Sequence, residues 1–126
     1  MIQFILDTNV VLLLSQDNPR INQIKPLLFS EDSQIFISVI AWWEIAIKVR
    51  AGKLVADIDE LRLLAKNHAF EELPVTGECF KAYLELPKLH KDPFDLMLLA
   101  QAITCPMRFI TGDSFLAEYS SLVMVV

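Results

Sequence analysis

Phe4-Ile5-Leu6-Asp7-Thr8-Asn9 lies near the start of the chain and changes abruptly from apolar to polar side chains. The three apolar residues predict a short buried strand, and Asp7 is the first charged residue of the protein. A second apolar run at 10–14 predicts a helix over 8–15, with Asp7 or Thr8 as its N-cap. An acid between a strand and a helix is expected at the carboxyl edge of a sheet, where parallel α/β proteins place their binding sites.

The first strand, predicted at 2–6, has four counterparts further along the chain. These short apolar segments are 34–37, 71–73, 108–110 and 123–126. Their apolar character is continuous rather than alternating, which is typical of strands covered on both faces. Helical patterns lie between them at 19–28, 39–51, 57–67, 76–87 and 92–105, and a short final helix follows 113. The sequence therefore predicts an α/β fold over 1–126, one domain with a central parallel sheet of about five short strands flanked by helices.

Composition limits the class of protein. Apolar residues make up 54% of the 126 residues, which argues against disorder, and no apolar run is long enough to cross a membrane. The charge count of 11 basic against 16 acidic residues gives a net charge of −5, unlike a non-specific nucleic-acid binder. A protein of this charge that processes a polyanion needs local compensation, which bound Mg²⁺ or Mn²⁺ would supply.

The chain has only two cysteines, Cys79 and Cys105, and their spacing does not match a metal site. We expect two reduced, buried thiols in a cytoplasmic protein.

Four acids follow predicted strands or lie early in predicted helices: Asp7, Glu44, Asp95 and Asp113. Each has an ordinary explanation, because acids are common helix caps and first-turn residues, and Glu44 can pair with Lys48 on an exposed face. Together they favour a shared site, since Asp7 and Asp113 are expected at the same edge of one sheet. Glu44 and Asp95 have apolar neighbours, which indicates carboxylates that line a pocket. Such a cluster, without histidine or cysteine, favours Mg²⁺ or Mn²⁺.

Four motifs occur in order over nearly the whole chain: Asp7-Thr8-Asn9-Val10, Trp43-Glu44-Ile45-Ala46-Ile47-Lys48, His90-Lys91-Asp92-Pro93-Phe94-Asp95 and Thr111-Gly112-Asp113. With these motifs the sequence resembles the PIN domain family, and most closely the VapC-like ribonuclease toxins of bacterial type II toxin–antitoxin modules. The resemblance implies Mg²⁺ or Mn²⁺ held by the residues that match Asp7, Glu44, Asp95 and Asp113. It also implies cleavage of single-stranded RNA, inhibition by a small cognate antitoxin, and a homodimer.

One position departs from the family pattern. Leu96 directly follows the acid of the third motif, where many relatives carry arginine. The departure means either a weakened contact with RNA or its transition state, or a degenerate or differently targeted enzyme.

Polar residues beside the acids are candidates for supporting roles. Thr8 and Asn9 either orient Asp7 or a bound water, or serve as helix caps. Lys48, Lys91 and His90 are candidate RNA contacts that would offset the negative average charge. The alternatives are a lysine placed to favour a helix C-terminus and a histidine in a solvated loop.

Trp42 and Trp43 leave two interpretations open. They either stack on RNA bases or pack in the core or a dimer interface.

The sequence therefore predicts a Mg²⁺- or Mn²⁺-dependent endoribonuclease of the cytoplasm, the toxin of a type II toxin–antitoxin pair, with no membrane association. The alternative is a catalytically weak PIN-fold module that binds a partner protein, and Leu96 is the feature that supports it.

Overall fold

Five parallel strands form the central sheet of the structure, a computed structural model that describes residues 1–88 and 92–126. The strands are β1 (Ile2–Leu6), β2 (Ser33–Ser38), β3 (Glu71–Leu73), β4 (Arg108–Thr111) and β5 (Val123–Val125). Their order across the sheet is β3-β2-β1-β4-β5. The predicted parallel sheet is confirmed, and every strand lies within one residue of its predicted bounds.

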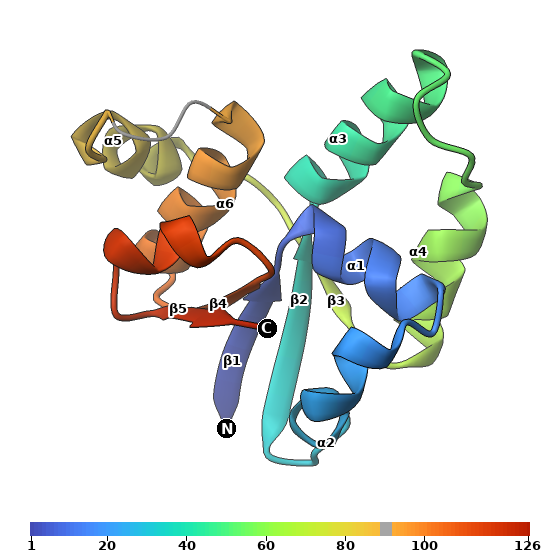
Figure 1. The fold of residues 1–126 in the computed structure, drawn as a ribbon. Coiled ribbons are helices and arrows are strands. Elements are labelled where there is room, and N and C mark those ends of the chain that lie inside the picture. Colours follow the sequence, from blue (N-terminus) through green and yellow to red (C-terminus); the bar gives the residue numbers. More distant parts are fainter. Residues whose placement is uncertain (89–91) are drawn as a thin grey trace.

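Helices connect the strands and cover the sheet (Figure 1). They are α1 (Thr8–Ser15), α2 (Lys25–Leu28), α3 (Val39–Arg50), α4 (Ile58–Asn67), α5 (Gly77–Glu85) and α6 (Pro93–Thr104), with 3₁₀ turns η1 (Pro19–Gln23) and η2 (Ser114–Glu118). The continuous helix predicted over 19–28 is wrong, because η1 and α2 divide that segment. Pro26 lacks the N–H that a continuous α-helix would need at that position.

The sheet separates two apolar cores, which explains why its strands are apolar without alternation. Phe4 and Leu6 of β1 pack with the core formed by α1, α2, α3 and α4, whereas Ile5 packs with α6 and η2 on the other face. Figure 1 shows these two groups of elements on opposite sides of the strands. Strands buried on both faces have this composition in parallel sheets.

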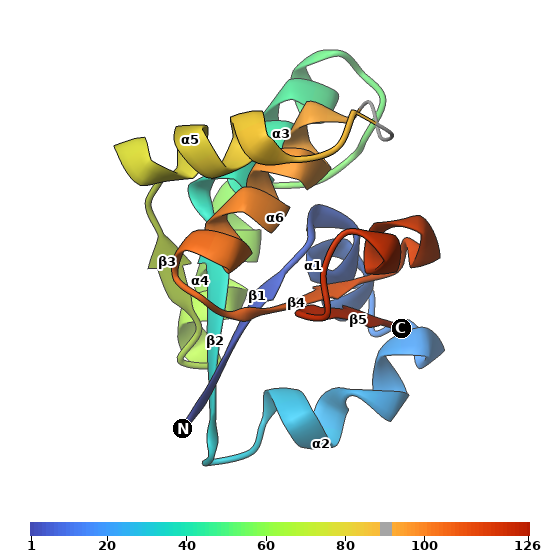
Figure 2. The same ribbon diagram turned by 90° about the vertical axis from the view of Figure 1, so that its left-hand side faces the viewer.

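The order of the strands reverses beside β1. From β1 the chain adds β2 and then β3 on one side, and then returns to add β4 and β5 on the other. In open parallel sheets the carboxyl ends of the strands diverge at such a reversal and leave a crevice. Figure 2 shows α3, α5 and α6 at this end of the sheet and α2 at the opposite end.

The cysteines and the two tryptophans differ in burial. Both cysteines are free thiols, but Cys79 is buried and Cys105 is exposed, so the expectation of two buried thiols is wrong for Cys105. Cys105 follows the last residue of α6, beyond the buried part of that helix. Trp42 belongs to the core, whereas Trp43 is 58% exposed. In the part of the chain that the structure describes, no helix has the length and hydrophobicity needed to cross a bilayer.

Candidate active site

A cavity of about 450 Å³ opens at the carboxyl ends of β1 and β4, where the strand order reverses. Its lining is polar and includes five carboxylates from four parts of the chain. The lining residues are Asp7, Thr8, Asn9, Leu12, Glu44, Lys48, Asp92, Asp95, Gly112 and Asp113. The structure thus brings together all four acids singled out in the sequence, and adds Asp92.

Asp7 is held in a fixed orientation from two sides. Its Oδ1 accepts a hydrogen bond of 2.7 Å from the Val10 backbone N–H, which makes Asp7 the N-cap of α1. Its Oδ2 accepts a hydrogen bond from the Thr111 hydroxyl and a long one of 3.4 Å from the Gly112 N–H. Because Thr111 ends β4 and Gly112 directly follows it, these bonds join the carboxyl ends of the neighbouring strands β1 and β4.

Burial dominates the acid–base behaviour of Asp7, which is only 4% exposed. Desolvation raises the pKa of its carboxyl above the ordinary value, and the charge of Glu44 acts in the same direction. The hydrogen bonds from Thr111, Val10 and Gly112 oppose this effect by stabilising the carboxylate, but they do not cancel it. Asp7 is therefore a buried acid whose ionised form is penalised by desolvation. A bound cation would stabilise that ionised form.

Glu44 enters the cavity from the second turn of α3 and is 6% exposed. Its Oε2 forms an ion pair of 2.8 Å with Lys48 Nζ, one helical turn later. The Glu44 hydrogen bond is the main cause that raises the pKa of Lys48, and the charges of Asp92 and Asp95 add to it. Within the described residues Glu44 Oε1 has no hydrogen-bond partner. Glu44 is thus paired with Lys48, as one sequence interpretation had it, but on a buried face rather than an exposed one.

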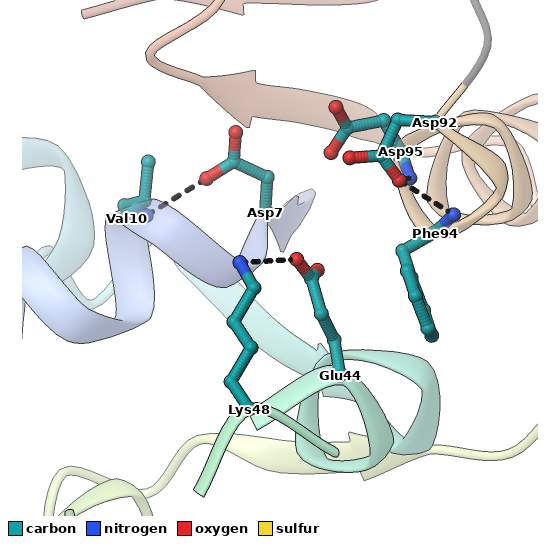
Figure 3. Close-up of polar contacts among 7 residues, drawn as sticks. All are labelled: Asp7, Val10, Glu44, Lys48, Asp92, Phe94 and Asp95. Atoms are coloured by element: carbon teal, nitrogen blue, oxygen red, sulfur yellow. Dashed lines mark hydrogen bonds and ion pairs between the residues drawn. The ribbon is translucent and has the colours of Figure 1, made fainter. Parts of the chain in front are cut away.

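Asp92 and Asp95 come from the start of α6. Asp92 is the N-cap, and its Oδ1 accepts hydrogen bonds from the Phe94 N–H at 2.9 Å and the Asp95 N–H at 3.3 Å. Figure 3 shows the carboxylates of Asp7, Glu44, Asp92 and Asp95 facing a common space. Asp92 is not among the four acids singled out in the sequence, although its spacing of three residues from Asp95 places both acids on one helical turn.

Asp113 completes the cavity from the turn after β4. Its backbone N–H donates to Thr111 Oγ1 at 3.0 Å, and its Oδ1 accepts from the Phe115 N–H at 3.0 Å, which caps η2. Gly112 lies between them in a crowded place, because a Cβ there would be 3.3 Å from Arg20 Nη2 and 3.4 Å from Asn9 Nδ2. Thr111 thus contacts both acids, because its hydroxyl donates to Asp7 and accepts from the Asp113 N–H. No local pattern in the sequence indicated this role.

Comparison with known protein families adds to this geometry. The family model described as "PIN domain" matches residues 4–122, which is nearly the whole chain. The chain belongs to the PIN domain family. A comparison with curated proteins gives no match.

Solved structures with the same PIN fold have low sequence identity to the chain. VapBC2 from Rickettsia felis, bound to a promoter DNA fragment, has a TM-score of 0.74 at 16% identity over 99% of this chain and 98% of that one. A toxin–antitoxin complex from Klebsiella pneumoniae gives 0.71 at 18% identity, covering 96% and 95%. VapBC-1 from nontypeable Haemophilus influenzae gives 0.70 at 17% identity, covering 98% of each chain. The resemblance noted from the sequence motifs thus holds for the family and the fold.

The donor atoms of the cavity in this PIN domain match the ligand preferences of Mg²⁺ and Mn²⁺. All five acids offer oxygen, and the orphaned Glu44 Oε1 is a buried acceptor. Across residues 1–88 and 92–126, no three acidic, histidine or cysteine side chains stand close enough to form a finished metal site. The chemistry of the residues fits a divalent cation, and binding would require their side chains to adjust.

The remaining predicted site residues of the PIN domain have different outcomes. Thr8 and Asn9 line the cavity, but the hydrogen bonds that hold Asp7 come from Val10, Thr111 and Gly112. Lys48 lines the cavity, whereas His90 and Lys91 lie outside the described residues.

Leu96 and Trp43 lie outside this cavity. Leu96 is 8% exposed and is not among the cavity-lining residues, so its side chain offers no RNA contact there. Trp43 packs edge-on against Phe94 at 5.4 Å between ring centres and lines a separate apolar hollow.

Proposed function

We propose that this PIN domain is a divalent-metal-dependent endoribonuclease that cleaves single-stranded RNA and acts as the toxin of a type II toxin–antitoxin pair. The observation that carries the proposal is the acidic cavity at the strand reversal, where Asp7, Glu44, Asp95 and Asp113 meet. Asp7 and Asp95 are assigned as the principal ligands of Mg²⁺ or Mn²⁺, with Glu44 and Asp113 as further ligands, directly or through water. Asp92, on the same turn as Asp95, is an additional candidate.

A divalent cation bound there would activate a water molecule for attack and neutralise charge on the scissile phosphate. The residues of the chain supply position and charge. Thr111 and the Val10 N–H fix the Asp7 carboxylate, and Thr111 also fixes the start of the turn that carries Asp113. Lys48 places a positive charge at the cavity, where an RNA phosphate would be drawn in despite the negative net charge of the protein.

The toxin role is supported by the fold relatives. The similar structures are of VapBC proteins and a toxin–antitoxin complex, and at this low sequence identity the toxin role of this chain is a proposal. We propose a small cognate antitoxin as the protein partner, a homodimer as the assembly and the cytoplasm as the location.

The direct test measures cleavage of a fluorescent single-stranded RNA by the purified protein. Cleavage is expected with Mg²⁺ or Mn²⁺ and is expected to stop with EDTA. Asp7→Asn should reduce the rate to below roughly a hundredth of wild type, the usual loss when a group that stabilises transition-state charge is removed.

Asp17→Asn is the matched control for this assay. Asp17 is an exposed acid outside the cavity, and its positive φ of 50° suits asparagine. If Asp7→Asn cleaves as fast as Asp17→Asn, the assignment of Asp7 fails.

A protein-binding module of the PIN fold is the second candidate. The apolar hollow around Trp43, Phe80 and Phe94, of about 380 Å³, favours it, since it lies outside the acidic cavity. A folded protein that binds Mn²⁺ weakly or not at all and cleaves no RNA would favour this function over the nuclease.

A further inference from the structure

Lys48 is a positive charge built into an otherwise acidic cavity. Its Nζ lies 2.8 Å from Glu44 Oε2, and Figure 3 shows the pair facing the space bordered by Asp7, Asp92 and Asp95. The two side chains differ in solvent exposure: Glu44 is 8% exposed and Lys48 is 46% exposed. The glutamate is therefore fixed in the wall of the cavity, while the ammonium group borders solvent.

The ion pair leaves buried polar atoms of the cavity without hydrogen-bond partners. Lys48 contacts one oxygen of Glu44, and the other, Oε1, has no hydrogen-bond partner within the described residues. The hydroxyl of Thr8, which is 4% exposed and lines the same cavity, also has no partner there. Buried polar atoms without partners are costly, so these two atoms mark a place that favours a ligand.

We propose that Lys48 is the resident counter-cation of this cavity, and that its pairing with Glu44 competes with the binding of a divalent cation. The inference rests on the proposed function and adds a residue that sets cation affinity. A lysine on a flexible four-carbon stem moves its ammonium into water at little cost when Glu44 is engaged by another cation. Lys48 thus stabilises the cation-free protein and weakens cation binding, which makes it a positioning residue for Glu44.

An ordinary helical ion pair would behave differently. Glu–Lys pairs four residues apart on exposed helices contribute little and are independent of ligands elsewhere. Here the glutamate is buried and shared with the cavity, so the two cations cannot both be its close partner without repelling each other. If Lys48 competes with the divalent cation, its replacement changes the affinity for that cation. If Lys48 and Glu44 form only an ordinary helical ion pair, the affinity does not change.

The first experiment measures Mn²⁺ binding to the full chain by calorimetry. Lys48→Met should bind Mn²⁺ more tightly than wild type, on the order of ten-fold, which is within the usual range of coupling between sites. Lys48→Arg should stay near wild type because the positive charge remains. Lys53→Met is the matched control, since Lys53 is exposed just beyond α3, does not line the cavity and loses the same charge.

The second experiment follows the reactivity of Lys48 itself, without measuring catalysis. Limited acylation with an amine-reactive ester, read by mass spectrometry, should modify Lys48 several-fold faster when Mg²⁺ is present. Lys25 is the internal control, because it pairs with Asp17 at 2.7 Å outside the cavity and its side chain is 35% exposed. Its rate should not respond to Mg²⁺.

Three results would overturn the inference, and they differ in whether the proposed nuclease function also fails. If wild type binds Mn²⁺, Asp7→Asn abolishes binding and Lys48→Met changes nothing, Lys48 has no such role while the proposed nuclease survives. If Mg²⁺ leaves Lys48 reactivity unchanged, the competition is absent. If neither wild type nor Lys48→Met binds Mn²⁺, the metal-dependent function and the role of Lys48 fail together.

Discussion

Asp7 serves two purposes at once, because one carboxylate starts a helix and lines the cavity. In the folded protein burial raises its pKa above the ordinary value of 3.8, so the folded state holds the proton more tightly than the unfolded chain does. The contribution of Asp7 to stability is therefore present below the unfolded pKa and is lost as the pH rises through the folded pKa. Above the unfolded pKa, Asp7 therefore lowers the free energy of unfolding relative to an acid whose pKa folding does not change.

Asp7→Asn removes this titration and is expected to gain stability relative to wild type as the pH rises. The difference in Tm between variant and wild type should increase as the pH rises above the ordinary carboxyl pKa of 3.8. Thermal unfolding in EDTA measures it. In Asp17→Asn the sign reverses, because Lys25 lowers the pKa of Asp17. A Tm difference for Asp7→Asn that is independent of pH would contradict the assignment of a raised pKa.

Thr111 is fully buried and donates to Asp7 while accepting from the Asp113 N–H. Thr111→Val keeps the shape and removes both bonds, so we expect a loss of roughly 10- to 100-fold in Mn²⁺ affinity or cleavage rate, as for other groups that orient metal ligands. Thr111→Ser retains the hydroxyl and should keep most of both. Calorimetry with Mn²⁺ is the measurement, and equal affinity of the valine and serine variants would refute the positioning role.

At the residue scale, local motifs in the sequence identified four acids that lie around one cavity, while their role as metal ligands stays a prediction. The acids Asp7, Glu44, Asp95 and Asp113 follow strands or begin helices, and the structure places them around one cavity. Prediction failed where a partner is distant in sequence. The Thr111–Asp7 bond joins residues 104 apart and depends on β1 pairing with β4, which no local pattern specifies.

Among the elements, α3 and α6 determine how the cavity is shaped, and a buried polar contact joins them. The Ser38 hydroxyl, at the N-cap of α3, donates to Gln101 Oε1 on α6. Gln101 Nε2 donates in turn to the Pro74 carbonyl at 3.2 Å, after β3. Since Glu44 lies on α3 and Asp95 on α6, this contact sets the relative position of two of the acids.

Gln101→Leu is expected to destabilise the fold by roughly 1 to 3 kcal/mol, because it leaves the buried Ser38 hydroxyl without its acceptor and an unsatisfied buried polar group costs about that much. Urea unfolding measures the change. A loss below about 0.5 kcal/mol, the range of neutral surface substitutions, would show that the contact has no structural weight.

The elements themselves were predictable where burial on both faces imposes a strong pattern, as in β1 and β2, or where a cap marks the start, as Ser38 does for α3. The predictions were less accurate for the segment around Pro26 and the one after Asp113. Each contains a short 3₁₀ turn where a helix was predicted, and such turns lack the periodicity of a full helix. The structural role of Gln101 on α6 was also not predicted, because one amide side chain within an apolar run does not indicate which buried groups it bonds to.

For the whole molecule, the proposed function predicts that expression in a bacterial host arrests growth. Asp7→Asn should relieve the arrest at equal protein level, and a small protein encoded beside the gene should relieve it for wild type when co-expressed. Growth curves with immunoblots of the expressed protein provide the measurement. Normal growth with abundant folded wild-type protein would argue against the toxin role.

The strand order β3-β2-β1-β4-β5 has a consequence for synthesis of the protein. Asp7 is translated before Thr111, which ends β4, and before Asp113, which follows that strand. A nascent chain therefore lacks a complete cavity until β4 has emerged from the ribosome and docked beside β1. For the proposed nuclease, this order of synthesis means that the part of the chain before β4 has no complete site with which to cleave RNA.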